Sequence, residues 1–164
     1  MRVVVVGGSG NLGSALLRAV ADADDIDLVG ISRRAPAVEM PWHEIDISRP
    51  DADVLLRAAF QGADAVVHLA WLLQPSHDIP KLRRTNVDGS RRMLDRAAAG
   101  DPELTVTRFR PGLVLQHDTA SEIQRYFIGG LAPPAAFDWA ARGRIPLLPL
   151  PSGLRLQFVH ADPR

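Results

Sequence analysis

Short apolar runs alternate with longer stretches of helical periodicity along the first two thirds of the chain. The run RVVVV at 2–6 is continuous and β-branched, which is typical of a strand buried on both faces. Similar runs predict further strands, and apolar residues three and four positions apart predict the helices between them. The predicted strands are 2–6, 28–32, 44–47, 65–71 and 104–109, and the predicted helices are 11–23, 51–61 and 79–99.

This alternation predicts the fold class. Strands and helices in turn imply right-handed βαβ crossovers and a parallel sheet with helices on both faces. We therefore predict one α/β domain over 1–164, a doubly wound parallel sheet of Rossmann type. Its core is expected over 1–112, followed by an irregular segment over 113–164 in which prolines interrupt any regular pattern. One apolar face of the helix at 51–61 is expected to comprise Val54, Leu55, Ala58 and Ala59.

Composition then limits the classes of function. The 164 residues carry 19 Lys+Arg and 19 Asp+Glu, a formal net charge of zero, so nucleic-acid binding is not expected. No apolar run approaches the roughly 18 residues of a membrane span, and the start of the chain shows no cleavage-site pattern, so we expect a cytoplasmic protein without a membrane partner. The absence of cysteine excludes disulfides and thiolate chemistry, and the five histidines lack metal-ligand spacing, so no metal is predicted.

The stretch VVVVGGSGNLG at 3–13 joins the first strand to the first helix. A glycine-rich turn at this place lets backbone N–H groups approach a pyrophosphate, and the helix N-terminus adds partial positive charge. Gly8, Gly10 and Gly13 match G-x-G-x-x-G, but Gly7, Gly10 and Gly13 equally match G-x-x-G-x-x-G. The glycines alone leave the subclass open, and a bare strand-to-helix turn stays an alternative.

Several segments together resemble the extended short-chain dehydrogenase/reductase family, the NAD(P)-dependent epimerases, dehydratases and reductases. They are VGGSGNLG at 6–13, VVHLAW at 66–71, NVDGS at 86–90, RPGLVL at 110–115 and QFVHAD at 157–162. The resemblance spans almost the whole chain and implies a dinucleotide cofactor. It also implies a small-molecule substrate, a nucleotide sugar or related carbonyl or hydroxyl compound, whose identity stays unknown.

The resemblance implies a role for each matching residue. The pyrophosphate would be surrounded by Gly7, Ser9, Gly10, Asn11, Leu12 and Gly13. Asp46 and Ile47 would meet the adenine, with a helix-capping Asp46 as the alternative, and Leu69 and Ala70 would line the ribose side.

Two polar residues outside the turn need separate interpretation. Asn86 would help organise the active site, with ordinary polarity of a helix surface as the alternative. His68 is interpreted as a packed strand residue rather than a catalyst.

The end of the second predicted strand decides the cofactor. An NAD-specific site places Asp or Glu there to accept from the ribose 2′-hydroxyl. Here the residues are Ser32, Arg33 and Arg34, and arginine can hold a 2′-phosphate through paired, charge-assisted hydrogen bonds. We predict NADP as the cofactor, with NAD as the alternative. If the two arginines bind no ligand, they are a solvated pair in an exposed loop.

The family's catalytic Tyr-x-x-x-Lys pair cannot be built from these residues. The sole tyrosine, Tyr126, is followed four residues later by Gly130, and the sole lysine, Lys81, lies far upstream. AAAG at 97–100 runs directly into DPELTVTRFRPG, where the family inserts a strand, a Ser-rich loop and the catalytic helix. We therefore name no catalytic residue and leave two explanations open, an internally deleted or truncated member and a sequence that omits residues of its parent.

Three functional hypotheses follow. The first is inherited hydride transfer between NADP(H) and a carbonyl or alcohol, with better binding than turnover. The second is a non-catalytic protein that senses NADP(H) or uses it to control a partner surface, and the third is an α/β fragment that binds nothing. The segment SEIQRYFIGGL at 121–131 would belong to the substrate-side lobe by resemblance, while helix packing or a homodimer contact stays open.

Overall fold

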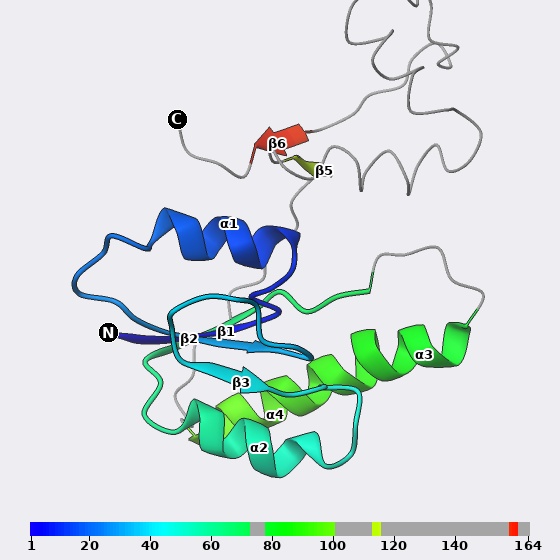
Figure 1. Ribbon diagram of the computed structural model, residues 1–164. Helices are drawn as coiled ribbons and strands as arrows, with labels where there is room; N and C mark the ends of the chain where they lie inside the picture. The colour runs from blue at the N-terminus through cyan, green and yellow to red at the C-terminus, as the bar shows by residue number, and fades with distance from the viewer. Residues whose placement is uncertain (73–77, 101–112, 116–157, 161–164) are drawn as a thin grey trace, which may run out of the picture. The chain divides into compact units, whose positions relative to one another are not determined.

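The computed structural model describes residues 1–72, 78–100, 113–115 and 158–160 (Figure 1). The chain divides into two compact units, residues 1–109 with 161–164 and residues 110–160. We describe each unit by itself.

A four-stranded parallel sheet forms the centre of the first unit. Its strands are β1 (Arg2–Val6), β2 (Asp27–Ser32), β3 (Trp42–Glu44) and β4 (Ala65–His68), in the order β3-β2-β1-β4. Val4 pairs with Val29 on one side and with Val66 on the other. The chain reverses its direction of strand addition at β1, as in the doubly wound dinucleotide-binding fold, so the predicted fold class is confirmed.

Helices cover both faces of this sheet (Figure 1). One face carries α1 (Asn11–Ala19), and the other carries α2 (Ala52–Phe60) and α4 (Ser90–Gly100). A short helix α3 (Ile79–Arg83) and a π-helical turn η1 (Arg84–Gly89) lead directly into α4. Among the residues that the structure describes, no helix is both long and apolar enough to cross a membrane.

The larger part of the core lies between the sheet and the α2/α4 face. Alternate side chains of β1, Val4 and Val6, join Ile31 of β2, Leu56 of α2 and Met93 of α4 in one buried cluster. Val3 and Val5 are also buried, on the opposite face, which explains why the four residues of β1 after Arg2 are all apolar.

On the α1 face, an indole ring covers the region between β2 and β3. Trp42 stands opposite Gly30, and a Cβ at Gly30 would lie 2.2 Å from two ring carbons of Trp42. The other end of the ring reaches the glycine turn, since a Cβ at Gly8 would lie 2.9 Å from Trp42 Cη2. Residues 33–41 join β2 to β3 without a helix, so Trp42 supplies apolar cover that a crossover helix gives elsewhere in the sheet.

Two sequence predictions about apolar faces are wrong. The predicted strand 44–47 is displaced, because β3 is Trp42–Glu44 and the buried Ile45 and Ile47 follow it in a loop that produces the same alternating pattern. In α2, Val54 is 75% exposed and Leu55 is 49% exposed, and Ala58 is exposed too. Of the four residues predicted to form the apolar face, Ala59 is the one that is buried. The packed face comprises Ala52, Leu56, Ala59 and Phe60.

Other differences concern boundaries. α1 ends at Ala19 rather than at residue 23. β4 ends at His68 rather than at residue 71, and the residues that follow it, 69–72, line a pocket. The predicted helix 79–99 is present as α3, η1 and α4 in sequence. The predicted strand 104–109 lies outside the described residues.

The second unit contains a parallel pair, β5 (Leu113–Leu115) and β6 (Phe158–His160). Val114 pairs with Val159, so the LVL part of RPGLVL and the FVH part of QFVHAD, far apart in sequence, lie side by side. The rest of the predicted irregular segment 113–164, including 121–131 and Tyr126, lies outside the described residues.

Candidate functional site

A pocket of about 310 Å³ lies where the four parallel strands end. Its walls come from the carboxyl ends of β1 and β2 and from the residues that follow β1, β2, β3 and β4. Crevices at this edge, beside the point where strand order reverses, are the ligand sites of open α/β sheets. The predicted site residues that line it are Gly7, Ser9, Gly10, Arg33, Arg34, Asp46, Ile47, Leu69 and Ala70.

Four predicted site residues do not line the pocket. Asn11, Leu12 and Gly13 form the first turn of α1, and Asn86 lies in η1. The sequence-based site set omitted further lining residues, namely Val6, Ile31, Ser32, Ile45, Trp71, Leu72 and Thr85. Most of these are strand ends or direct neighbours of predicted residues, so the end of each buried strand is the signal that identifies them.

The glycine turn needs glycine at two positions for steric reasons. Gly7 has φ +89°, and a Cβ there would lie 2.5 Å from the backbone nitrogen of Ala70. A Cβ at Gly13 would lie 2.3 Å from the carbonyl oxygen of Gly7. The geometry therefore places the strict requirements on the G-x-x-G-x-x-G pattern, whereas the constraint at Gly8 comes from Trp42.

The N-terminus of α1 faces this turn without a side-chain cap. Gly10 is the N-cap residue with extended backbone, and the first turn contains no acidic side chain. The side-chain oxygen of Asn11 is buried and has no hydrogen-bond partner among the described residues. An uncapped helix start presents backbone N–H groups and partial positive charge, which suit an anion.

The loop after β2 carries the two arginines. Ser32 Oγ donates to the carbonyl oxygen of Arg34 at 2.5 Å, and the Ala35 N–H donates to Glu44 Oε1 at 2.9 Å. These two bonds hold both groups of one peptide, the one that joins Arg34 to Ala35. Both arginines are exposed and line the pocket, and within the described part of the chain no hydrogen bond or ion pair holds either guanidinium. Positive charge is thus available at this wall.

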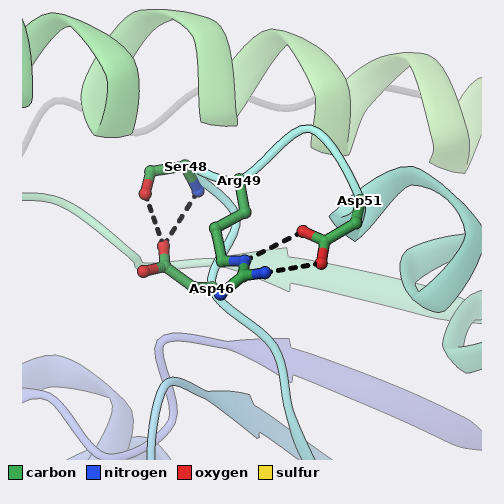
Figure 2. A network of polar contacts seen from close by, with 4 residues as sticks. All are labelled: Asp46, Ser48, Arg49 and Asp51. Atoms are coloured by element: carbon green, nitrogen blue, oxygen red, sulfur yellow. Dashed lines mark hydrogen bonds and ion pairs between the residues drawn. The ribbon is translucent and has the colours of Figure 1, made fainter.

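Asp46 stabilises the turn after β3 (Figure 2). Its Oδ1 accepts from the Ser48 N–H at 3.0 Å and from Ser48 Oγ at 2.7 Å. The residue at the start of α2 is instead Asp51, whose carboxylate binds Arg49 through two hydrogen bonds that lower the pKa of Asp51. The alternative interpretation of Asp46 as a helix cap is therefore wrong: it closes a local turn and lines the pocket.

The neighbouring Ile47 is braced by α4 and η1. Arg92 Nη1 donates to the Ile47 carbonyl oxygen at 2.6 Å, and Arg92 Nε lies 3.0 Å from Asp53 Oδ1. A Cβ at Gly89 would lie 3.0 Å from that same carbonyl oxygen, so the helix backbone packs directly on the loop.

Asn86 holds the segment after β4. The Leu72 N–H donates to Asn86 Oδ1 at 2.8 Å, and Asn86 Nδ2 donates to the Leu72 carbonyl oxygen at 2.9 Å. The bonds come from a π-helical turn, a feature that often occurs at functional sites. Asn86 thereby orders a pocket wall, which simple surface polarity does not describe.

His68 lies outside the pocket lining. Its Nε2 is 2.8 Å from Ser90 Oγ of α4, and its Nδ1 is buried with no partner among the described residues. Burial lowers the pKa of His68 below 6.5.

Residues 3–109 match the model of the NAD dependent epimerase/dehydratase family. The chain belongs to this family. The family assignment covers the sheet, the helices and every wall of the pocket described above.

Individual relatives share less than a third of their residues with this chain over the aligned regions. A NAD-dependent glucose-6-phosphate dehydrogenase from Haloferax volcanii is 29% identical over 98 residues, which are 58% of this chain and 37% of that protein. A short-chain dehydrogenase/reductase superfamily protein from Agrobacterium tumefaciens, solved with bound NAD, is 25% identical with a TM-score of 0.55, covering 73% of this chain and 33% of that one.

The Bordetella bronchiseptica enzyme WbmG, solved in complex with NAD, is 26% identical with a TM-score of 0.53, covering 61% of this chain and 34% of that one. The chain therefore spans about a third of the length of these relatives.

Proposed function

We propose that this chain binds a nicotinamide dinucleotide, with preference for NADP(H), for hydride transfer to or from a carbonyl or alcohol group of a small, nucleotide-sugar-like substrate. The observation that carries the proposal is the pocket itself. It joins an uncapped helix start on one side to two arginines without described partners on the other.

The residues present fit the dinucleotide. The absence of side chains at Gly7 and Gly13 lets the turn pack closely, so that the N–H groups at the uncapped start of α1 can approach a pyrophosphate, and no acidic side chain of the first turn of α1 opposes it. Asp46 and Ile47 would lie along the adenine, and Leu69 would lie on the ribose side. The Agrobacterium and Bordetella relatives hold NAD, which supports a dinucleotide in this fold.

The preference for NADP(H) rests on the Arg33–Arg34 loop. An acidic residue at the end of β2 would accept from a ribose 2′-hydroxyl, but this chain places arginines at the pocket wall. Two guanidiniums can donate several charge-assisted hydrogen bonds to a 2′-phosphate.

The chain's own contribution is binding and orientation. When bound, the nicotinamide ring supplies or accepts the hydride. No catalytic residue is assigned, because the sequence contains one tyrosine and one lysine that do not form the family pair. That observation favours a second candidate, a protein that senses NADP(H) without turnover.

Calorimetric titration of the full chain with NADP⁺ and with NAD⁺ tests the cofactor. Arg33→Asp with Arg34→Asp should weaken NADP⁺ binding by about 30-fold or more, since charged hydrogen bonds are lost and repulsion is added, and should change NAD⁺ binding by less than about twofold. Arg57→Asp with Arg91→Asp is the matched control, because it makes the same charge change at exposed positions outside the pocket. Equal effects of the Arg33/Arg34 variant on both cofactors would contradict the 2′-phosphate assignment.

Turnover separates the two candidates. Oxidation of NADPH with a panel of carbonyl compounds supports the enzyme, and tight binding with no oxidation supports the sensor. Binding of neither cofactor contradicts both.

A further inference from the structure

The Arg33–Arg34 loop is held by a chain of hydrogen bonds that begins on the neighbouring strand. Trp42 Nε1 of β3 donates to Ser32 Oγ at 3.1 Å, and Ser32 Oγ donates to the Arg34 carbonyl oxygen at 2.5 Å. The polarity of this chain is determined by chemistry. An indole N–H can only donate, so the serine oxygen accepts and its single proton is left for Arg34.

The donor at the head of this chain is sterically locked. The ring of Trp42 lies over Gly30, where no Cβ fits, and reaches the α-carbon side of Gly8. Its position therefore depends on β2 and on the glycine turn together. Trp42 itself does not line the pocket, so it can affect a ligand there only through the residues it contacts.

A second tether from β3 acts on the same loop. Glu44 Oε1 accepts from the Ala35 N–H at 2.9 Å, one residue beyond Arg34. Both groups of the peptide that joins Arg34 to Ala35 are thus held, its carbonyl oxygen by Ser32 and its N–H by Glu44, whereas the arginine side chains stay exposed and unpaired among the described residues. A fixed backbone under long, free side chains reduces the entropy lost when they close on an anion.

We propose that Trp42 is a positioning residue which, through Ser32, orders the Arg33–Arg34 loop and sets the preference for a dinucleotide with a 2′-phosphate. The proposal rests on the proposed function, because it assigns the 2′-phosphate to these arginines. It differs from a packing role in one respect: a packing role affects both cofactors, while loop order affects the phosphorylated one.

The experiment uses the ratio of dissociation constants, Kd for NAD⁺ over Kd for NADP⁺, measured on the full chain. Trp42→Phe retains an aromatic ring over Gly30 and removes the N–H, and Ser32→Ala interrupts the chain at its middle. Each should lower the ratio about three- to tenfold, the effect of one hydrogen bond, with Kd for NAD⁺ changed less than about twofold. The double variant should lower the ratio no further than either single variant, since both remove the same connection.

A conservative variant of Ser32 tests whether the hydroxyl group is what matters. Ser32→Thr keeps a hydroxyl and should keep the ratio within about twofold of the original. If Trp42→Phe unfolds, as judged by circular dichroism, Trp42→Leu takes its place, because Ser32 itself lines the pocket and Ser32→Ala alone does not separate the role of Trp42 from a direct contact with the ligand. Unchanged ratios in Ser32→Ala, or equal weakening of both cofactors by Trp42→Phe, would overturn the positioning role.

Failure of this inference is distinguishable from failure of the proposed function. If Arg33→Asp with Arg34→Asp lowers the ratio while Trp42→Phe and Ser32→Ala do not, the 2′-phosphate site stands and the role of Trp42 is refuted. If the arginine variant leaves the ratio unchanged, the 2′-phosphate assignment fails and the inference fails with it.

Discussion

The glycine turn and the Arg33–Arg34 loop form two walls of one pocket but are held by different parts of the chain. In the turn, the Gly7 N–H donates to the Ile31 carbonyl oxygen at 2.8 Å, and the Gly10 N–H donates to the Gly7 carbonyl oxygen at 2.9 Å. In the loop, the bonds that matter come from the side chains of Ser32 and Glu44. One wall is built of backbone and the other is built of side chains.

This difference determines how each wall responds to substitution. A backbone wall packed without space for a Cβ tolerates almost no side chain, so its sequence shows a rigid spacing of glycines. A side-chain wall can change one hydrogen bond at a time without loss of the fold. We therefore expect cofactor preference in this fold to be adjusted at β2 and β3, and the capacity to bind a dinucleotide to depend on the turn.

The largest effect is expected from a single methyl group added to the glycine turn, which tests whether this wall tolerates no side chain. Gly7→Ala should lower the free energy of unfolding by about 3 kcal/mol, from left-handed backbone strain and a Cβ forced to 2.5 Å from the Ala70 nitrogen, and should abolish NADP⁺ binding. Gly62→Ala is the matched control: φ is +70° but nothing lies within 4 Å, so about 1 kcal/mol is expected. Urea unfolding followed by circular dichroism measures both, and equal costs would show that backbone strain alone acts at Gly7.

The turn was also the part of the site that sequence could predict best. Its glycines follow a continuous run of valines, which is typical of a buried strand, and backbone geometry leaves few residue types at Gly7 and Gly13. The parallel sheet and the helices on both of its faces followed from the alternation of apolar runs. These features depend on local pattern, which a single sequence contains.

Features that depend on tertiary packing were missed. The helix α2 has two apolar stripes of similar spacing, and only contact with Met93 and the sheet selects Leu56 over Leu55. The role of Trp42 could not be predicted, because Trp42 and its neighbours Pro41 and His43 match no motif. Its role depends on contact with Gly30 of the neighbouring strand. The spacing of residues in the sequence likewise could not predict the two hydrogen bonds between Asn86 and the backbone of Leu72.

Arg92 tests whether the Ile47 wall belongs with the side-chain walls. Arg92→Gln removes the charged donor to the Ile47 carbonyl oxygen and the contact with Asp53, a pair whose side chains are 19% and 44% exposed. We expect a loss of about 1–2 kcal/mol in the free energy of unfolding, reduced by solvent screening. Kd for NADP⁺ and for NAD⁺ should rise together, because the adenine is common to both.

The matched control is Arg91→Gln, one residue earlier on α4, where the side chain is exposed. It should change stability by less than about 0.5 kcal/mol. A change in the ratio of the two dissociation constants in Arg92→Gln would instead connect Arg92 to the arginine loop and contradict the separation of the two walls.

The smallest effect concerns the side-chain contact between β4 and α4, which gives stability a pH dependence. Burial lowers the pKa of His68, so below its ordinary value of 6.5 the unfolded chain takes up a proton that the folded chain resists. The stabilisation is therefore complete above pH 6.5 and is lost progressively as the pH falls through 6.5 toward the lower folded pKa. His68→Gln, which can still bond Ser90, should remove this component from urea midpoints measured about one unit above and below that value. His43→Gln, at an exposed position of β3, should retain it, and an unchanged pH profile in His68→Gln would show that another group causes the loss.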